Sequence, residues 1–207
     1  MYKIISDSAC DLSQAYIEKN NIDIVPLSVS FDGETYYRDG IDITRNECYK
    51  RMVENPGVYP KTSLPSVEQY ANVFEEYAKT NTPVVCFTIS LIFSGSFNSA
   101  MNARELVLED YPGAEIHVID SKQNTVTQAL IIDQMVRMQK ADLPLDLALK
   151  NIEKVIDSAR IFFTVGSLDY LQMGGRIGKV AAAAGKIDVK PVIIMKNGDI
   201  GLGGIGR

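Results

Sequence analysis

Residues 83–89 (Pro-Val-Val-Cys-Phe-Thr-Ile) constrain the fold more than any other part of this sequence. Such a strand, apolar on both faces, is typical of a parallel sheet that helices cover. The segments after it are predicted to alternate in type: helix 96–109, strand 115–120, helix 126–140 and helix 145–159. Strands and helices in this order predict an α/β fold, a parallel sheet with helices on both faces.

The N-terminal part adds two strands, a helix and a hairpin. Residues 3–5 form a short apolar strand, and Asp11 with Gln14 has the spacing of a capping box that opens a helix. Residues 24–31 alternate apolar and polar side chains, as a half-buried strand does. Asp32-Gly33 follows directly and predicts the turn of a hairpin.

Two more helix starts carry the same signature. Thr44 is followed by Glu47 and Ser66 by Gln69, each pair at capping-box spacing. For Ser66 we therefore favour the role of a helix cap over that of a ligand contact.

The pattern changes after residue 160. Asn197-Gly198 lies between two apolar segments and predicts a hairpin in an α+β unit. We expect an α/β domain over 1–160, with the 56–66 loop at a ligand cleft, and part of a smaller α+β domain over 161–207. Because a ribbon of two strands is marginally stable, we also expect the chain to be shortened at its C-terminal end.

Composition restricts the function. The 207 residues carry a formal net charge of −5, which argues against nucleic acid as the main partner. The three cysteines are scattered, so they match neither a disulfide framework nor a zinc site and read as reduced thiols. The sequence shows no signal-peptide layout and no apolar run of membrane-spanning length, so we expect a cytoplasmic protein.

Two hydroxyl-rich segments point to a binding site. Residues 62–66 (Thr-Ser-Leu-Pro-Ser) and 90–96 (Ser-Leu-Ile-Phe-Ser-Gly-Ser) each precede a predicted helix. The start of a helix offers unpaired backbone N–H groups and a partial positive charge, and hydroxyls add neutral donors. The two segments together predict a ligand with an anionic head, held mainly by hydroxyls and backbone amides.

A small-molecule hydrolase or phosphotransferase is the rival hypothesis, with Asp7, Asp11 and Ser94 as its reactive groups. It is motivated by polar residues at the ends of parallel strands, where α/β enzymes place their sites. Ser94 lacks the surroundings of a nucleophile elbow, and the single histidine, His117, lies in an apolar strand where a structural role is favoured. Asp11 is better explained as a helix cap, whereas Asp7 stays a candidate for the wall of a site.

The glycine-rich segment 174–178 leaves two readings open. It has neither the Walker nor the dinucleotide spacing, so a tight turn is one interpretation. The other places Arg176 at the surface as an anion contact or partner anchor.

Taken together, these segments resemble the DegV family of bacterial fatty-acid-binding proteins. The resemblance rests on short motifs in family order along nearly the whole chain: Ile5-Ser6-Asp7-Ser8 with Asp11, Thr62 to Ser66, Ser94-Gly95-Ser96, Asp120-Ser121, Leu171 with Gly174-Gly175-Arg176-Ile177, and Lys190-Pro191. Leu64 and Ser96 depart from it, since the family usually has Gln and often has Thr at those places. Family members also continue past the position of Arg207.

The resemblance implies a carrier without catalysis of its own. A long-chain fatty acid would lie between two lobes, and a partner fatty acid kinase would phosphorylate its carboxylate. The implied carboxylate contacts are Thr62, Ser63, Ser94, Gly95 and Ser96, with Asp7 and Ser8 as site-wall residues and Arg176 and Lys179 as partner-docking residues. No metal or cofactor is implied, and peripheral membrane contact during ligand exchange is an accompanying expectation.

Overall fold

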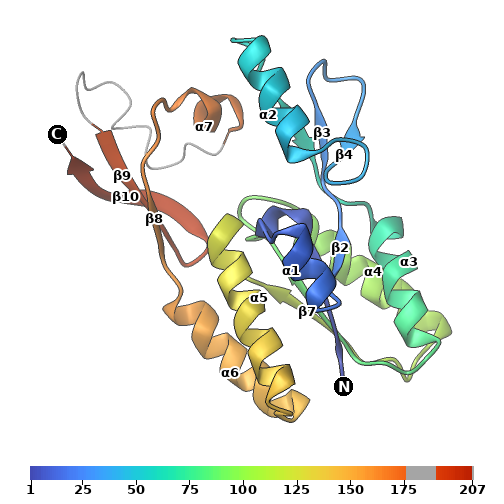
Figure 1. Cartoon of the computed structure of the whole chain (residues 1–207). Coiled ribbons are helices and arrows are strands. Elements are labelled where there is room, and N and C mark those ends of the chain that lie inside the picture. The colour runs from blue at the N-terminus through green and yellow to red at the C-terminus, as the bar shows by residue number, and fades with distance from the viewer. Residues whose placement is uncertain (176–189, 207) are drawn as a thin grey trace.

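The computed structural model describes residues 1–175 and 190–206. Its main sheet has four parallel strands in the order β2-β1-β6-β7 (Figure 1). These strands are β1 (Lys3–Asp7), β2 (Asp23–Val25), β6 (Val84–Thr88) and β7 (Ile116–Asp120). Every residue of β1 and of β6 is buried, as the doubly apolar pattern of 83–89 predicts.

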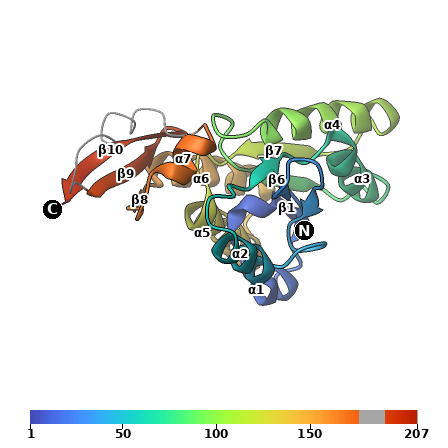
Figure 2. The same cartoon turned by 90° about the horizontal axis from the view of Figure 1, so that it is seen from above.

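Helices cover both faces of this sheet, which confirms the predicted α/β class. One face packs against α3 (Val67–Ala78) and α4 (Ser96–Asp110). The other packs against α1 (Gln14–Lys19), α5 (Thr125–Lys140) and α6 (Leu145–Ser158). Seen from above, α4 and α1 lie on opposite sides of the sheet (Figure 2).

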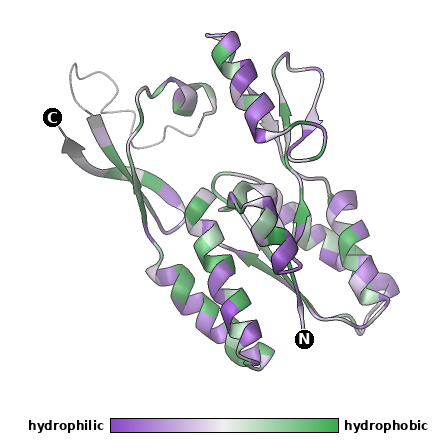
Figure 3. Ribbon diagram, viewed as in Figure 1, coloured by the Kyte–Doolittle hydropathy of each residue, from purple (hydrophilic) through white to green (hydrophobic). Residues whose placement is uncertain are grey.

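The amphipathic helices explain this layering. In α6 the buried residues Ala148, Ile152 and Ile156 are four positions apart and line one side of the helix. Figure 3 shows apolar and polar residues interspersed along α5 and α6, as expected of helices with one packed and one exposed side. Among the residues that the structure describes, no helix is long and apolar enough to cross a membrane.

A small antiparallel sheet, in the order β4-β3-β5, stands beside the main one. It contains β3 (Ser28–Ser30), β4 (Tyr37–Arg38) and β5 (Lys61–Ser63), and α2 (Arg45–Glu54) follows β4. The predicted turn at Asp32-Gly33 is confirmed, because β3 and β4 pair as a hairpin around it. The single strand predicted over 24–31 is wrong. Pro26, which has no N–H group, ends β2 in the main sheet, and the chain then enters β3 in the small one.

The predicted caps had mixed outcomes. Both capping boxes, at Thr44 on α2 and at Ser66 on α3, form as predicted. The box predicted at Asp11 is wrong. Asp11 ends the short 3-10 helix η1 (Ser8–Cys10) with a φ of 51°, and Ser13 caps α1 instead, accepting a hydrogen bond from the Tyr16 N–H.

A second lobe begins after α6. It comprises β8 (Ile161–Phe163), α7 (Asp169–Met173), β9 (Lys190–Lys196) and β10 (Asp199–Gly206). The strands form an antiparallel sheet in the order β10-β9-β8, at the left of Figure 1. The hairpin predicted at Asn197-Gly198 joins β9 to β10, with both turn residues at positive φ. The boundaries 1–160 and 161–207 remain a prediction.

Candidate functional site

The start of α4 carries three of the predicted carboxylate contacts. Gly95 is the N-cap residue, and the Ser94 and Ser96 hydroxyl oxygens lie 2.8 Å apart. The Ser96 N–H donates to Ser94 Oγ over 3.2 Å, while Ser94 is part-exposed and Ser96 is buried. Hydroxyls that already share a hydrogen bond are held in place, and the first turn of the helix adds backbone donors beside them.

Thr62 and Ser63 lie on β5, upstream of the start of α3. They pair with Val29 and Ser28 of β3 in the antiparallel sheet, and both are exposed. Ser66 sits nearer the helix and caps it, as we predicted from its spacing to Gln69. The hydroxyls of Thr62 and Ser63 are therefore presented by a strand, whereas those of Ser94 and Ser96 stand at a helix start.

The fold brings these two segments together. A side-chain atom on Gly95 would meet Leu64 Cδ2 at 3.5 Å, so Leu64 lies directly over the start of α4. One turn further along α4, the Ser99 hydroxyl donates to the Pro65 carbonyl oxygen over 2.8 Å. Segments separated in sequence thus form one hydroxyl-rich neighbourhood, and we describe it as the candidate head-group site.

The 56–66 loop also meets the second lobe. The ring of Tyr59 lies edge-on to the ring of Tyr170 in α7, with 5.0 Å between ring centroids. The loop that leads into Thr62 and Ser63 therefore touches both lobes. Its placement at a ligand cleft stays a prediction that this contact supports.

Asp7 lies at the end of β1 and is fully buried. Its Oδ2 accepts the Ile89 N–H over 2.8 Å, and its Oδ1 accepts the Gln128 side-chain amide over 2.9 Å. Burial raises the pKa of Asp7 to about 6, and these hydrogen bonds oppose the rise. Its carboxylate thus connects β1, α5 and the residue that follows β6.

Two of the reactive groups of the rival hypothesis, Asp7 and Asp11, and the single histidine have separate surroundings. Both Asp7 oxygens already accept hydrogen bonds, and Asp11 lies in the turn after η1. Burial raises the pKa of Asp11, and nearby Arg45 opposes that rise. His117 is 2.9 Å from Glu115 at the outer edge of the sheet. Within the described residues, no cluster of His, Cys, Asp or Glu has the makings of a metal site.

A cavity of about 890 Å³ lies along the edge strand β2. Its walls come mainly from α1, α3 and the loop before α2, including Ile17, Ile24 and Val73. Of the predicted site residues, Ser8 lines this cavity, and its hydroxyl accepts the Leu27 N–H over 3.1 Å. The residues of the candidate head-group site do not line this cavity, so the cavity and the predicted carboxylate contacts do not coincide.

The two predicted docking residues, Arg176 and Lys179, lie outside the described residues. The start of their segment is described: α7 ends at Met173, Gly174 is its C-cap, and Gly175 has a φ of +69°. Such a conformation favours glycine, so the tight-turn interpretation holds at Gly175.

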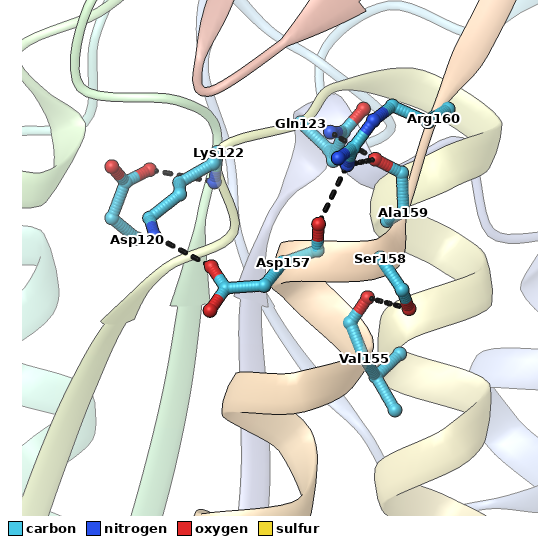
Figure 4. Close-up of polar contacts among 8 residues, drawn as sticks. All are labelled: Asp120, Lys122, Gln123, Val155, Asp157, Ser158, Ala159 and Arg160. Carbon is cyan, nitrogen blue, oxygen red and sulfur yellow. Dashed lines mark hydrogen bonds and ion pairs between the residues drawn. The ribbon is translucent and has the colours of Figure 1, made fainter.

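The junction between the lobes holds a polar cluster (Figure 4). Lys122 Nζ lies 3.0 Å from the Asp157 carboxylate, and the Gln123 side-chain amide donates to the Ala159 carbonyl oxygen over 3.2 Å. Arg160 Nη1 donates to the carbonyl oxygens of Asp157 and Ala159. The loop after β7 is thereby fastened to the segment that leads into the second lobe.

Sequence reasoning missed one polar residue beside Asp7. Gln128 is buried in α5, and its side-chain amide reaches both Asp7 and the Ser6 hydroxyl. The signal was a polar residue at an apolar position, since Ile131, Ile132 and Gln128 lie on the buried side of one helix. Ser90, two residues after β6, belongs to the predicted hydroxyl-rich segment, but its partner in the second lobe was not predicted; it is buried and hydrogen-bonded.

Comparison with known proteins gives the family. The family model described as "Uncharacterised protein, DegV family" matches residues 1–204. A DegV domain-containing protein of Clostridium perfringens is 32% identical over 199 residues, which are 95% of this chain and 67% of that protein.

Solved structures of DegV-fold proteins support the same family assignment. A stearic acid-binding protein from Eubacterium ventriosum is 71% identical, with a TM-score of 0.96 over 100% of this chain and 71% of its own. A DegV family protein from Thermus thermophilus, described by its fatty acid binding, is 28% identical, with a TM-score of 0.88 over 100% of this chain and 71% of its own. The predicted resemblance is confirmed, and this chain belongs to the DegV family.

Proposed function

We propose that this chain binds a long-chain fatty acid between its two lobes and presents the carboxylate to a partner fatty acid kinase. The observation that carries the proposal is the hydroxyl-rich neighbourhood where the residues directly after β5, Leu64 and Pro65, contact the start of α4. Two DegV-fold proteins, from Eubacterium ventriosum and Thermus thermophilus, are described as binding fatty acids, which supports the same ligand class here.

The chemistry of the head-group site suits a carrier. Thr62, Ser63, Ser94 and Ser96 offer neutral hydroxyls at the site. Gly95 and Ser96 place backbone N–H groups at the helix start, where the Ser96 N–H donates to Ser94 Oγ until a carboxylate replaces that acceptor. Neutral donors orient a carboxylate without neutralising it, whereas a bidentate arginine would hold it more strongly. A carboxylate held in this way stays reactive toward an activated phosphate on another protein.

The acyl chain would supply most of the affinity. Burial of ~15 methylene groups gains roughly 12 kcal/mol gross, at about 0.8 kcal/mol for each group. Ordering the ligand and the protein offsets part of this gain. The head-group site therefore needs to contribute orientation more than binding strength.

In this proposal the chain performs no catalysis and uses no cofactor. Its chemistry is confined to holding the acid, so the ATP-dependent step lies on the kinase. The three cysteines are free thiols, and two of them, Cys10 and Cys86, are buried, which fits a reducing cytoplasmic setting. Peripheral contact with a membrane during ligand exchange completes the proposed cycle.

The proposal is tested with the double variant Thr62→Ala/Ser94→Ala. Loss of two hydrogen bonds to the carboxylate, about 1 kcal/mol each, should weaken stearate binding about thirtyfold and slow acyl-phosphate formation by a fatty acid kinase. Ser66→Ala is the matched control, because it removes a neighbouring hydroxyl that caps α3. Unchanged stearate affinity in the double variant would refute the assignment of these two residues.

A further inference from the structure

Ser90 joins the two lobes through a single buried side chain. Its backbone N–H donates to the Gln123 carbonyl oxygen over 2.9 Å, which fixes it to the first lobe. Its hydroxyl donates to the carbonyl oxygen of Gly198 over 2.6 Å. Gly198 belongs to the β9–β10 turn of the second lobe, so one residue is hydrogen-bonded to both lobes.

The same residue sets the path of the chain into the head-group site. The Ser90 carbonyl oxygen accepts the Phe93 N–H over 2.9 Å and the Ser94 N–H over 3.2 Å. These bonds close a turn directly before the start of α4. The position of Ser94 therefore follows the position of Ser90.

The second lobe also packs against this turn through apolar contacts. Phe93 packs against the buried cluster of the second lobe, which consists of Ile193, Met195 and Ile200. A side-chain atom on Gly198 would lie 3.0 Å from the Ser90 hydroxyl oxygen and 3.4 Å from Ile92 Cδ1, so the hairpin turn sits tightly on the segment.

The first lobe holds its side of the junction through the cluster of Figure 4. Gln123, whose carbonyl oxygen holds Ser90, also donates from its side chain to Ala159, two residues before β8. The ion pair between Lys122 and Asp157 fastens the same loop to the end of α6. These contacts restrain the linker between the two lobes. A shift of the second lobe would therefore displace Ser90 through its hydrogen bond to Gly198.

We propose that Ser90 is a positioning residue for Ser94. Through Ser90, the β9–β10 turn of the second lobe sets the affinity of the head-group site for a carboxylate. This inference rests on the proposed function and extends it. The second lobe then helps to arrange the head-group donors, in addition to covering the ligand. Contact with the acid itself belongs to Ser94.

The experiment measures two ligands on the full chain. Stearate and octadecan-1-ol share one acyl-chain length and differ at the head group, and each displaces a fluorescent long-chain fatty acid. Ser90→Ala, Ser94→Ala and their double variant are compared with Ser158→Ala. In the control, the Ser158 hydroxyl donates to Val155 within the same helix (Figure 4). Thermal unfolding is followed for every variant.

The expected result is a selective loss. Ser90→Ala should bind stearate about tenfold more weakly and octadecan-1-ol within about twofold of the unmodified chain. It loses the buried hydrogen bond to Gly198 and the one that the Ser90 hydroxyl accepts from the Ile92 N–H. The double variant should bind stearate no more weakly than Ser94→Ala alone, because both changes act through one residue.

Other outcomes separate the two proposals. Equal weakening of both ligands by Ser90→Ala, or losses that add in the double variant, would overturn the positioning role and leave the proposed function standing. Failure of the unmodified chain to bind stearate would overturn both. If Ser90→Ala does not fold, Phe93→Leu replaces it, because the smaller side chain reduces the apolar contact between this turn and the second lobe. It should weaken the binding of stearate more than that of octadecan-1-ol, and equal weakening of both would overturn the proposal.

Discussion

Replacing Asp7 by Asn should remove a pH-dependent loss of stability that the native fold carries. Burial raises the pKa of Asp7 from 3.8 to about 6 in the folded chain. Below pH 3.8, the pKa of Asp7 in the unfolded chain, the carboxyl is protonated in both the folded and the unfolded chain and does not disfavour folding. Between pH 3.8 and about pH 6 the unfolded chain loses the proton of Asp7 more readily than the folded chain, because the buried carboxyl ionises at a cost. The free energy of unfolding therefore falls as the pH rises through this range.

The raised pKa of Asp7 sets the order of magnitude of the effect. A pKa difference between 3.8 and about 6 corresponds to about 3 kcal/mol in the free energy of unfolding at neutral pH. An asparagine is uncharged at every pH, as the protonated Asp7 is, and its side-chain oxygen still accepts one of the two hydrogen bonds. We therefore expect the free energy of unfolding of Asp7→Asn, relative to that of the native chain, to rise by up to about 3 kcal/mol between about pH 4 and pH 7.

Urea unfolding at several values between about pH 4 and pH 7 measures this difference directly. Asp110→Asn, which neutralises an exposed carboxylate at the end of α4, is the matched control and should follow the native chain. Equal slopes of stability against pH in Asp7→Asn and the native chain would show that Asp7 does not titrate in this range, and would refute the reasoning.

Three further predictions concern packing, capping and reactivity. Phe74→Ala should lower the free energy of unfolding by about 3–5 kcal/mol, measured by urea, because Phe74 is fully buried between α3 and the sheet. Ser66→Ala should cost about 1 kcal/mol in the same assay, since a capping box is lost; no change would contradict the cap. Alkylation of the native chain, followed by mass spectrometry, should modify Cys48 before Cys10 and Cys86, because Cys48 is part-exposed and the other two are buried. Equal rates would contradict the packing.

Much of the fold was predictable because its signals are local. The apolar run at 83–89 marks a buried parallel strand, and the spacing of Thr44 to Glu47 identifies a helix start within four residues. The prediction failed where two local signals competed. Asp11 and Ser13 both stand before α1, and the left-handed conformation of Asp11 leaves the cap to Ser13. Pro26 divided a continuous alternation into strands of two different sheets.

The hydroxyls of the candidate site were predictable from the sequence, whereas the long-range hydrogen bonds that hold the surrounding segments in place were not. Ser94 and Thr62 stand in short segments whose composition suggests a ligand. The bonds from Ser90 to Gly198 and from Gln128 to Asp7 join residues more than a hundred positions apart. Such pairings depend on the packing of whole elements, and nothing in the neighbouring sequence specifies them. At most, a buried polar residue at an apolar position shows that a partner exists.

Organic extraction of the purified chain, followed by mass spectrometry for fatty acids, tests the central claim most directly. A fatty-acid carrier should release about one long-chain acid per chain, because an acyl-chain site encloses most of its ligand. Thr62→Ala/Ser94→Ala, prepared in parallel, should release less. A chain that yields no acid, and that takes up none when stearate is added before extraction, would contradict the account.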